Sequence, residues 1–287
     1  MTGRKRIWTL GALAATMAWA APALANNNST MTVTIKQTAK PFVYQYPGVS
    51  LDILGLKLGM SVQQAEKVLA AYSKNKPMIF KKSLLLSYKT VRVSSQNFIW
   101  KIAVDNGQSG GITLFFGSPA TGNKLLHIDL TMGFPDATKG PTLKATDAAL
   151  YKKYGPATKT PVSPTDTYIQ WVFGQHNLKK SCPYVDDIPC DAVNFGNDPG
   201  QYAFFGYDND PTADPALYRN SYAYGNYVDV EAAVHPAGED ASRVGSIYLS
   251  LNDQAQQAIT SDLSQKQLQT AARAAYAKQT PGAAPKF

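Results

Sequence analysis

The chain has 287 residues, of which 44 % are apolar and 17 % charged, and its formal net charge is +8 at pH 7. This balance excludes a wholly disordered polymer, and the lack of a regular glycine period excludes a collagen-like fibre. The length allows a buried hydrophobic core in one large or two small domains.

The first 25 residues are predicted to be a secretory signal peptide. They have a basic start at residues 4–6, an apolar stretch over residues 7–20, and the small-residue ending Ala23-Leu24-Ala25 before Asn26. The apolar stretch is shorter than the roughly 18 residues that a membrane-spanning helix needs. No apolar run of that length occurs in the rest of the chain. We therefore expect a periplasmic or secreted protein with no transmembrane segment in the mature chain.

Loss of the three basic leader residues lowers the formal charge from +8 to +5. The remaining lysines are scattered along the chain instead of forming a basic run, which argues against a nucleic-acid partner. An envelope protein or a polysaccharide remains a possible partner.

The N-terminal half begins with two expected strands and a helix. After a flexible start at residues 26–30, the segments 31–36 and 42–46 have β-rich composition. A helix is predicted after Gly59, where Ser61 is placed to cap it and Gln64 completes a capping-box pattern. Its apolar residues recur at helical spacing: Val62, Ala65, Val68, Leu69 and Tyr72.

Strands with one buried face are predicted next, from alternation with a period of two. One or two strands are expected in residues 78–93. The residues expected on the buried side of the three following strands are Trp100, Ile102 and Val104, then Ile112, Leu114 and Phe116, then Leu126, Ile128, Leu130 and Met132. Those expected on the opposite side are Lys101 and Ala103, Thr113 and Phe115, and His127, Asp129 and Thr131.

A second helix is predicted over residues 143–154, with Thr142 as its cap and Gly155-Pro156 as its stop. Further strands are expected at 168–173, 228–234 and 247–251, followed by a helical tail at 253–279 and a disordered end at 280–287. The sequence thus predicts an α+β protein with a mainly antiparallel sheet and helices packed on one face. Residues 31–252 are expected to form one domain, or two related halves at about 31–135 and 136–252.

Cys182 and Cys190 are the only cysteines. In an exported chain two cysteines eight positions apart are expected to form a disulfide. Zinc binding with His176 and the nearby aspartates is the alternative, although their spacing matches no closed zinc pattern.

Two segments carry a family resemblance. Two stretches resemble a GLxLGMS…ALxxKYGxP pattern of exported bacterial proteins of unknown function: Gly55-Leu56-Lys57-Leu58-Gly59-Met60-Ser61, and the helix end Ala148-Ala149-Leu150-Tyr151-Lys152-Lys153-Tyr154-Gly155-Pro156. The first segment also resembles the start of the SmpA/OmlA (BamE-type) and β-lactamase-inhibitor-protein-like fold. The resemblance implies a helical pair on an antiparallel sheet and a non-catalytic role in binding or envelope assembly. No lipobox cysteine is present, and the second segment has no GMS element of its own.

Three groups of residues are candidate functional sites. His127 and Asp129 share a strand face and form an acid/base pair if a serine lies nearby, whereas His176 and His235 are isolated near turns. A weak calcium candidate has oxygen-bearing side chains at every second position: Asp208, Asp210, Thr212 and Asp214. A dense aromatic zone is the candidate ligand or partner surface: Tyr202, Phe204, Phe205, Tyr207, Tyr218, Tyr222, Tyr224 and Tyr227.

None of these groups forms a recognisable catalytic motif, and no cofactor is predicted. The sequence therefore favours an exported non-enzymatic binding or envelope-associated protein. The alternative is a secreted hydrolase whose site is assembled from residues that lie far apart in the chain.

Overall fold

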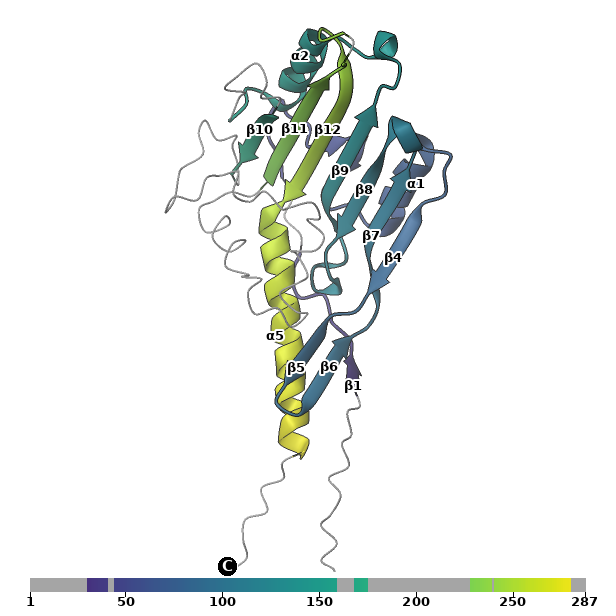
Figure 1. Cartoon of the computed structure of the whole chain (residues 1–287). Helices are drawn as coiled ribbons and strands as arrows, with labels where there is room; N and C mark the ends of the chain where they lie inside the picture. The colour runs from purple at the N-terminus through teal and green to yellow at the C-terminus, as the bar shows by residue number, and fades with distance from the viewer. Residues whose placement is uncertain (1–29, 41–43, 159–167, 175–227, 239, 280–287) are drawn as a thin grey trace, which may run out of the picture.

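The computed structural model describes residues 30–40, 44–158, 168–174, 228–238 and 240–279. Its main feature is an antiparallel sheet with the strand order β10-β11-β12-β9-β8-β7-β4 (Figure 1). The strands of this large sheet are β4 (Met78–Lys82), β7 (Phe98–Asp105), β8 (Gly110–Phe116), β9 (Leu125–Gly133), β10 (Tyr168–Phe173), β11 (Val228–Pro236) and β12 (Val244–Asp253).

The expected α+β class is confirmed. Helices α1 (Val62–Tyr72) and α2 (Leu143–Tyr154) both pack on one side of the large sheet, which we call the first face. The main hydrophobic core lies between these helices and the sheet, and it includes the fully buried Trp171. The indole N–H of Trp171 donates to the Gly155 carbonyl at 2.8 Å, so the core ties strand β10 to the end of α2.

Both helices begin where the sequence predicts. Ser61 and Gln64 form a complete capping box at α1, and the Thr142 side chain accepts a hydrogen bond from the Ala145 amide at α2. Gly155 ends α2 with a φ of 84°, a backbone conformation that glycine adopts without strain.

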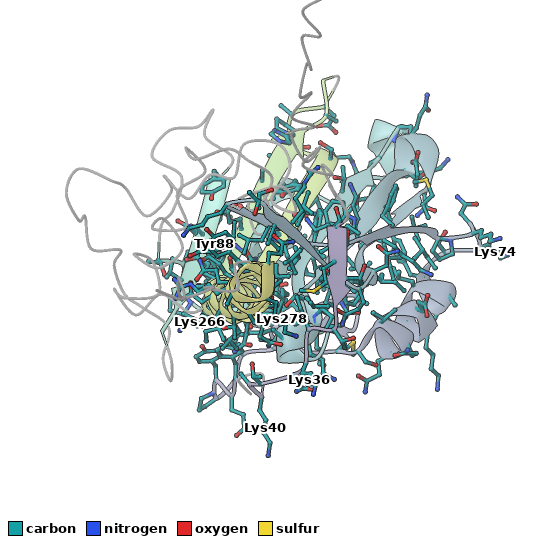
Figure 2. All side chains as sticks on the ribbon, turned by 90° about the horizontal axis from the view of Figure 1, so that it is seen from below. Lys36, Lys40, Lys74, Tyr88, Lys266 and Lys278 are labelled. Carbon is teal, nitrogen blue, oxygen red and sulfur yellow. The ribbon has the colours of Figure 1, made fainter. Side chains whose placement is uncertain are left out.

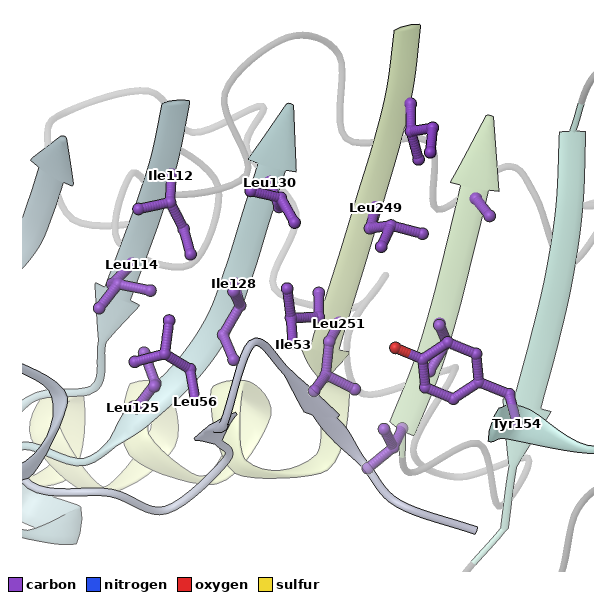
Figure 3. Close-up of a cluster of buried hydrophobic side chains, with 14 of the residues drawn as sticks. Ile53, Leu56, Ile112, Leu114, Leu125, Ile128, Leu130, Tyr154, Leu249 and Leu251 are labelled. Carbon is purple, nitrogen blue, oxygen red and sulfur yellow. The ribbon is translucent and has the colours of Figure 1, made fainter. Parts of the chain in front are cut away.

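A short hairpin closes the first-face core. Strands β2 (Asp52–Ile53) and β3 (Leu56–Lys57) are joined by Leu54 and Gly55, whose φ angles are 54° and 83°. Positive φ at both central residues is the geometry of a type I′ hairpin turn. Ile53 and Leu56 are buried against the sheet, as Figure 3 shows beside Leu125, Ile128 and Leu251.

Two bulges change the alternation that the sequence predicts. Phe80 pairs with Lys101 and Lys81 with Ile99, so Trp100 is an extra residue in β7. Its ring lies near Phe115 on the opposite side of the sheet, whereas Ile99 packs on the first-face core. The prediction that Trp100 points the same way as Ile102 is therefore wrong, because a bulge inserts one residue and inverts the alternation beyond it.

The second bulge lies in β9. Phe115 pairs with His127 and Phe116 with Leu125, so Leu126 is the extra residue. Leu125 consequently joins the first-face core, and Leu126 is buried outside it.

A smaller sheet packs on the C-terminal helix. Its order is β1-β6-β5, formed by β1 (Thr30–Val33), β5 (Leu85–Tyr88) and β6 (Val91–Ser95), and β1 runs parallel to β6. The expected helical tail is α5 (Gln254–Gln279), whose Leu268 and Ala272 belong to a second core with residues of this small sheet. Residues 78–95 thus contain three strands, and residues 44–46 contain none.

Figure 2 looks upward along α5. The labelled Lys36 and Lys40 lie on one side of the molecule and Lys74 on another. Gln267 of α5 ties the chain at Lys36 to the helix, because its side chain bonds both the Lys36 amide and its carbonyl.

Candidate functional site: the polar face of the large sheet

The second face of the large sheet, opposite α1 and α2, carries polar side chains in register. Strand pairing places one row across it, with Lys101, Phe115, His127, Asn252 and Asp229 in line on β7, β8, β9, β12 and β11. The adjacent row on β8, β9, β12, β11 and β10 is Thr113, Asp129, Ser250, Glu231 and Gln170. Side chains from distant parts of the chain therefore meet because their strands are neighbours in the sheet.

His127 and Asp129 form the largely buried centre of this polar face. The His127 Nε2 atom lies 2.7 Å from Asp129 Oδ1, and the His127 side chain is 3 % exposed. The Tyr248 hydroxyl donates to the same carboxylate oxygen at 2.7 Å. Ser250 Oγ lies 3.3 Å from His127 Nε2. The predicted acid/base pair thus exists, and a serine lies beside it.

The charges of His127 and Asp129 each favour the ionised form of the other side chain. Burial alone would lower the pKa of His127, but the negative charge of Asp129 and its hydrogen bond, with Asp229 and Glu231 nearby, raise this pKa above its usual value. Burial would raise the pKa of Asp129, but the charge of His127 and the surrounding hydrogen bonds lower it. The pair is therefore an imidazolium–carboxylate ion pair at mildly acidic pH.

The geometry differs from that of a Ser-His-Asp triad. A triad uses one ring nitrogen for the carboxylate and the other as the base toward serine. Here Nε2 faces both Asp129 and Ser250, and Nδ1 is buried without a hydrogen-bond partner among the described residues. Because the proton on Nε2 is held by Asp129, this nitrogen has no lone pair with which to activate Ser250.

Asp229 lies beside this centre and differs from Asp129 in its protonation. It is 4 % exposed and accepts a hydrogen bond from Gln254 Nε2 at 2.7 Å. Burial, followed by the charge of Glu231, raises the pKa of Asp229 to about 8. At neutral pH the face thus holds a protonated carboxyl group at Asp229 and an ionised one at Asp129, separated by the single strand β12.

The first turn of α5 adds a group of side-chain amides. The Asp253 side chain caps this helix by accepting a hydrogen bond from the backbone N–H of Gln256 at 2.8 Å. Burial raises the pKa of Asp253 to about 7. Gln254, Gln256 and Gln257 are each less than 5 % exposed. The buried amide atoms without a hydrogen-bond partner in the described part of the chain are Gln170 Oε1, Asn252 Nδ2, Gln254 Oε1, Gln257 Oε1 and both polar atoms of the Gln256 side chain.

Sequence reasoning identified only part of this surface. It placed His127 and Asp129 on one strand face, and it predicted the strand at 247–251 that carries Ser250. It missed the buried amides, because a glutamine-rich helix start resembles a solvent-exposed one. His235 is exposed near the end of β11, away from the central pair.

The other sequence candidates lie outside the described residues. These are His176, Cys182, Cys190, the aromatic zone at 202–227 and the calcium candidate at 208–214. In the ranges that the structure describes, no cluster of three or more histidine, cysteine, aspartate or glutamate side chains could hold a metal ion.

Comparison with family models, with curated proteins and with solved structures finds no match to this chain. Of the helices in the described ranges, none combines the length and the apolar character needed to cross a bilayer.

Proposed function

We propose that this chain is an exported, non-enzymatic binding protein of the periplasm or the extracellular space that takes a neutral, hydroxyl-rich ligand at the polar face. The observation that carries this proposal is the group of buried amide atoms, around Asn252 and Gln256, that have no hydrogen-bond partner among the described residues. An unpaired buried polar group costs about 1–3 kcal/mol. A folded chain that keeps several of them together is best explained by a ligand or ordered water that pairs with them.

The chemistry of the surface selects the class of ligand. Side-chain amides donate and accept at once, as sugar hydroxyls do, and the protonated Asp229 adds a donor below pH 8. Asp129 and Glu231 disfavour an acidic ligand on the same face. A neutral saccharide of the cell envelope therefore fits better than an acidic polysaccharide. The resemblance to exported binding and assembly proteins agrees with this proposal.

The test uses thermal melting of the mature chain with neutral cello-oligosaccharides and chito-oligosaccharides, and with acidic galacturonate oligomers. We expect the neutral probes to raise the melting temperature. Gln256→Leu removes both unpartnered amide atoms at similar volume, so it should abolish this shift while the free protein melts at an equal or higher temperature. Gln63→Leu, at an exposed position of α1, is the matched control and should keep the shift.

Two results would overturn the proposal. One is the absence of a shift with every neutral probe, and the other is an equal shift in the Gln256→Leu variant. Either would mean that ordered water satisfies the amides.

A secreted hydrolase is the second candidate, because Ser250 Oγ lies 3.3 Å from His127 Nε2. A fluorophosphonate probe labels serines that a base activates. We expect no labelling of Ser250, since His127 Nε2 is hydrogen-bonded to Asp129. Labelling that disappears in Ser250→Ala would establish the hydrolase instead.

A further inference from the structure

Strand β4 is an open edge of the large sheet. It is the last strand in the sheet order, and β7 is its only partner in the described sheet. Figure 1 shows it on the outer side of the sheet beside β7. An edge strand presents unpaired backbone N–H and C=O groups that can accept a further strand.

The side chains of this edge are unusually apolar for an exposed strand. Met78 is 50 % exposed, Ile79 47 % and Phe80 39 %. Phe80 pairs with Lys101 on the second face, and Ile79 pairs with Ile102, whose side chain belongs to the first-face core. The edge therefore offers apolar contacts on both faces of the sheet, where an added strand would place its alternate side chains.

The charged side chains of β4 are all basic, and the acidic residue of β7, Asp105, lies at the end of that strand opposite to the partner of Lys81. Lys81 and Lys82 end β4, Lys76 precedes it, and Lys101 lies on the neighbouring strand with its ammonium 5.4 Å from the Phe80 ring. No acidic residue occurs within β4. Two copies pairing through β4 would bring these lysines into one two-stranded ribbon, where like charges repel. The charge thus disfavours a second copy and favours an acidic partner.

We propose that β4 is a docking edge for an extended segment of another protein in which acidic residues alternate with apolar ones. The segment pairs with β4 through its backbone over about five residues, roughly 17 Å of strand. Because successive side chains of a strand point to opposite faces, its apolar side chains lie beside Met78 and Phe80 on the second face, and its carboxylates lie beside Lys81 on the first face. This inference is independent of the ligand proposed for the polar face.

The experiment measures fluorescence anisotropy of a labelled nine-residue peptide, with capped ends and glutamate alternating with valine, on titration with the mature chain. We expect saturable binding that weakens with salt. Lys81→Glu should weaken binding about tenfold, because it replaces an attraction by a repulsion. Lys144→Glu makes the same change of charge at an exposed lysine of α2, and it should leave binding of the peptide unchanged.

Two further arms test pairing through the backbone. The peptide N-methylated at alternate residues on one edge should lose binding, and the peptide methylated on the other edge should keep it. Met78→Thr introduces a residue of high strand propensity while removing exposed apolar area on the second face, and it should weaken binding in a protein whose melting temperature is unchanged. Gln256→Leu should leave peptide binding unaffected.

The proposal would be overturned by equal binding of both methylated peptides, by an equal loss in Lys81→Glu and Lys144→Glu, or by equal affinity for a lysine–valine peptide. Sedimentation that shows a dimer dissociated by Met78→Thr would also overturn it, because the occupant of the edge would then be a second copy.

Discussion

Replacement of Asp229 by asparagine is predicted to stabilise the protein, and increasingly so as the pH rises. Asp229 is buried next to Glu231, and both burial and this neighbouring charge oppose its ionisation. Asparagine keeps the oxygen that accepts from Gln254 Nε2 and removes the titratable group. The variant therefore isolates the cost of the buried charge with little change in packing.

The magnitude follows from linkage. The pKa of Asp229 is about 8 in the folded protein against an ordinary value of 3.8. Between these values the unfolded chain is ionised and the folded one is not, so the free energy of unfolding falls by about 1.4 kcal/mol per pH unit. The full cost, on the order of 6 kcal/mol, is reached above pH 8. The advantage of Asp229→Asn should thus be small at pH 4 and large at pH 9.

The assay is urea unfolding followed by the fluorescence of the buried Trp171, at pH 5 and pH 9. Asp240→Asn is the control, since Asp240 is exposed and the pKa of its carboxyl is lowered by bonds from Ser242. Its stability relative to the wild type should be the same at both pH values. An Asp229→Asn variant whose advantage does not grow between pH 5 and pH 9 would refute the reasoning.

Three further changes test the fold. Leu54→Asn should raise the free energy of unfolding by about 1 kcal/mol, because asparagine tolerates the φ of 54° better than leucine, and Leu54→Val should lower it. Gly110→Ala should lower the free energy of unfolding, measured in urea, by about 3 kcal/mol or more, because the added Cβ would lie 2.0 Å from the Thr131 carbonyl oxygen. Trp171→Phe should cost about 2–3 kcal/mol, since it leaves the Gly155 carbonyl without its indole donor, and a loss below 0.5 kcal/mol would contradict that role.

Much of the local structure could be predicted from the sequence, because local chemistry decides it. Helix α2 has the predicted bounds, and the capping box of α1 uses the two side chains that the pattern named. Strand β10 also has its predicted bounds. The bulges at Trp100 and Leu126 could not be predicted, because an extra residue leaves the composition of a strand unchanged and shows itself only in the pairing.

The polar face was harder to predict for a related reason. His127 and Ser250 are 123 residues apart and become neighbours only because β12 pairs with β9. Alternation within each strand says which side a residue faces, and nothing in it says which strand lies next. The burial of Gln256 likewise depends on packing around the start of α5, and helical periodicity does not predict that packing.

The position of β12 has a consequence for how the chain assembles. This strand is the last of the large sheet to be synthesised, yet it lies inside the sheet, between β9 and β11. Until it arrives, β9 on one side and β11 on the other have no common neighbour, so the sheet exists as two separate ribbons. Such closure over a long stretch of chain is slow. Until β12 is in place, the edges of β9 and β11 that it later pairs are exposed, and they are the sites at which the unfinished sheet would aggregate.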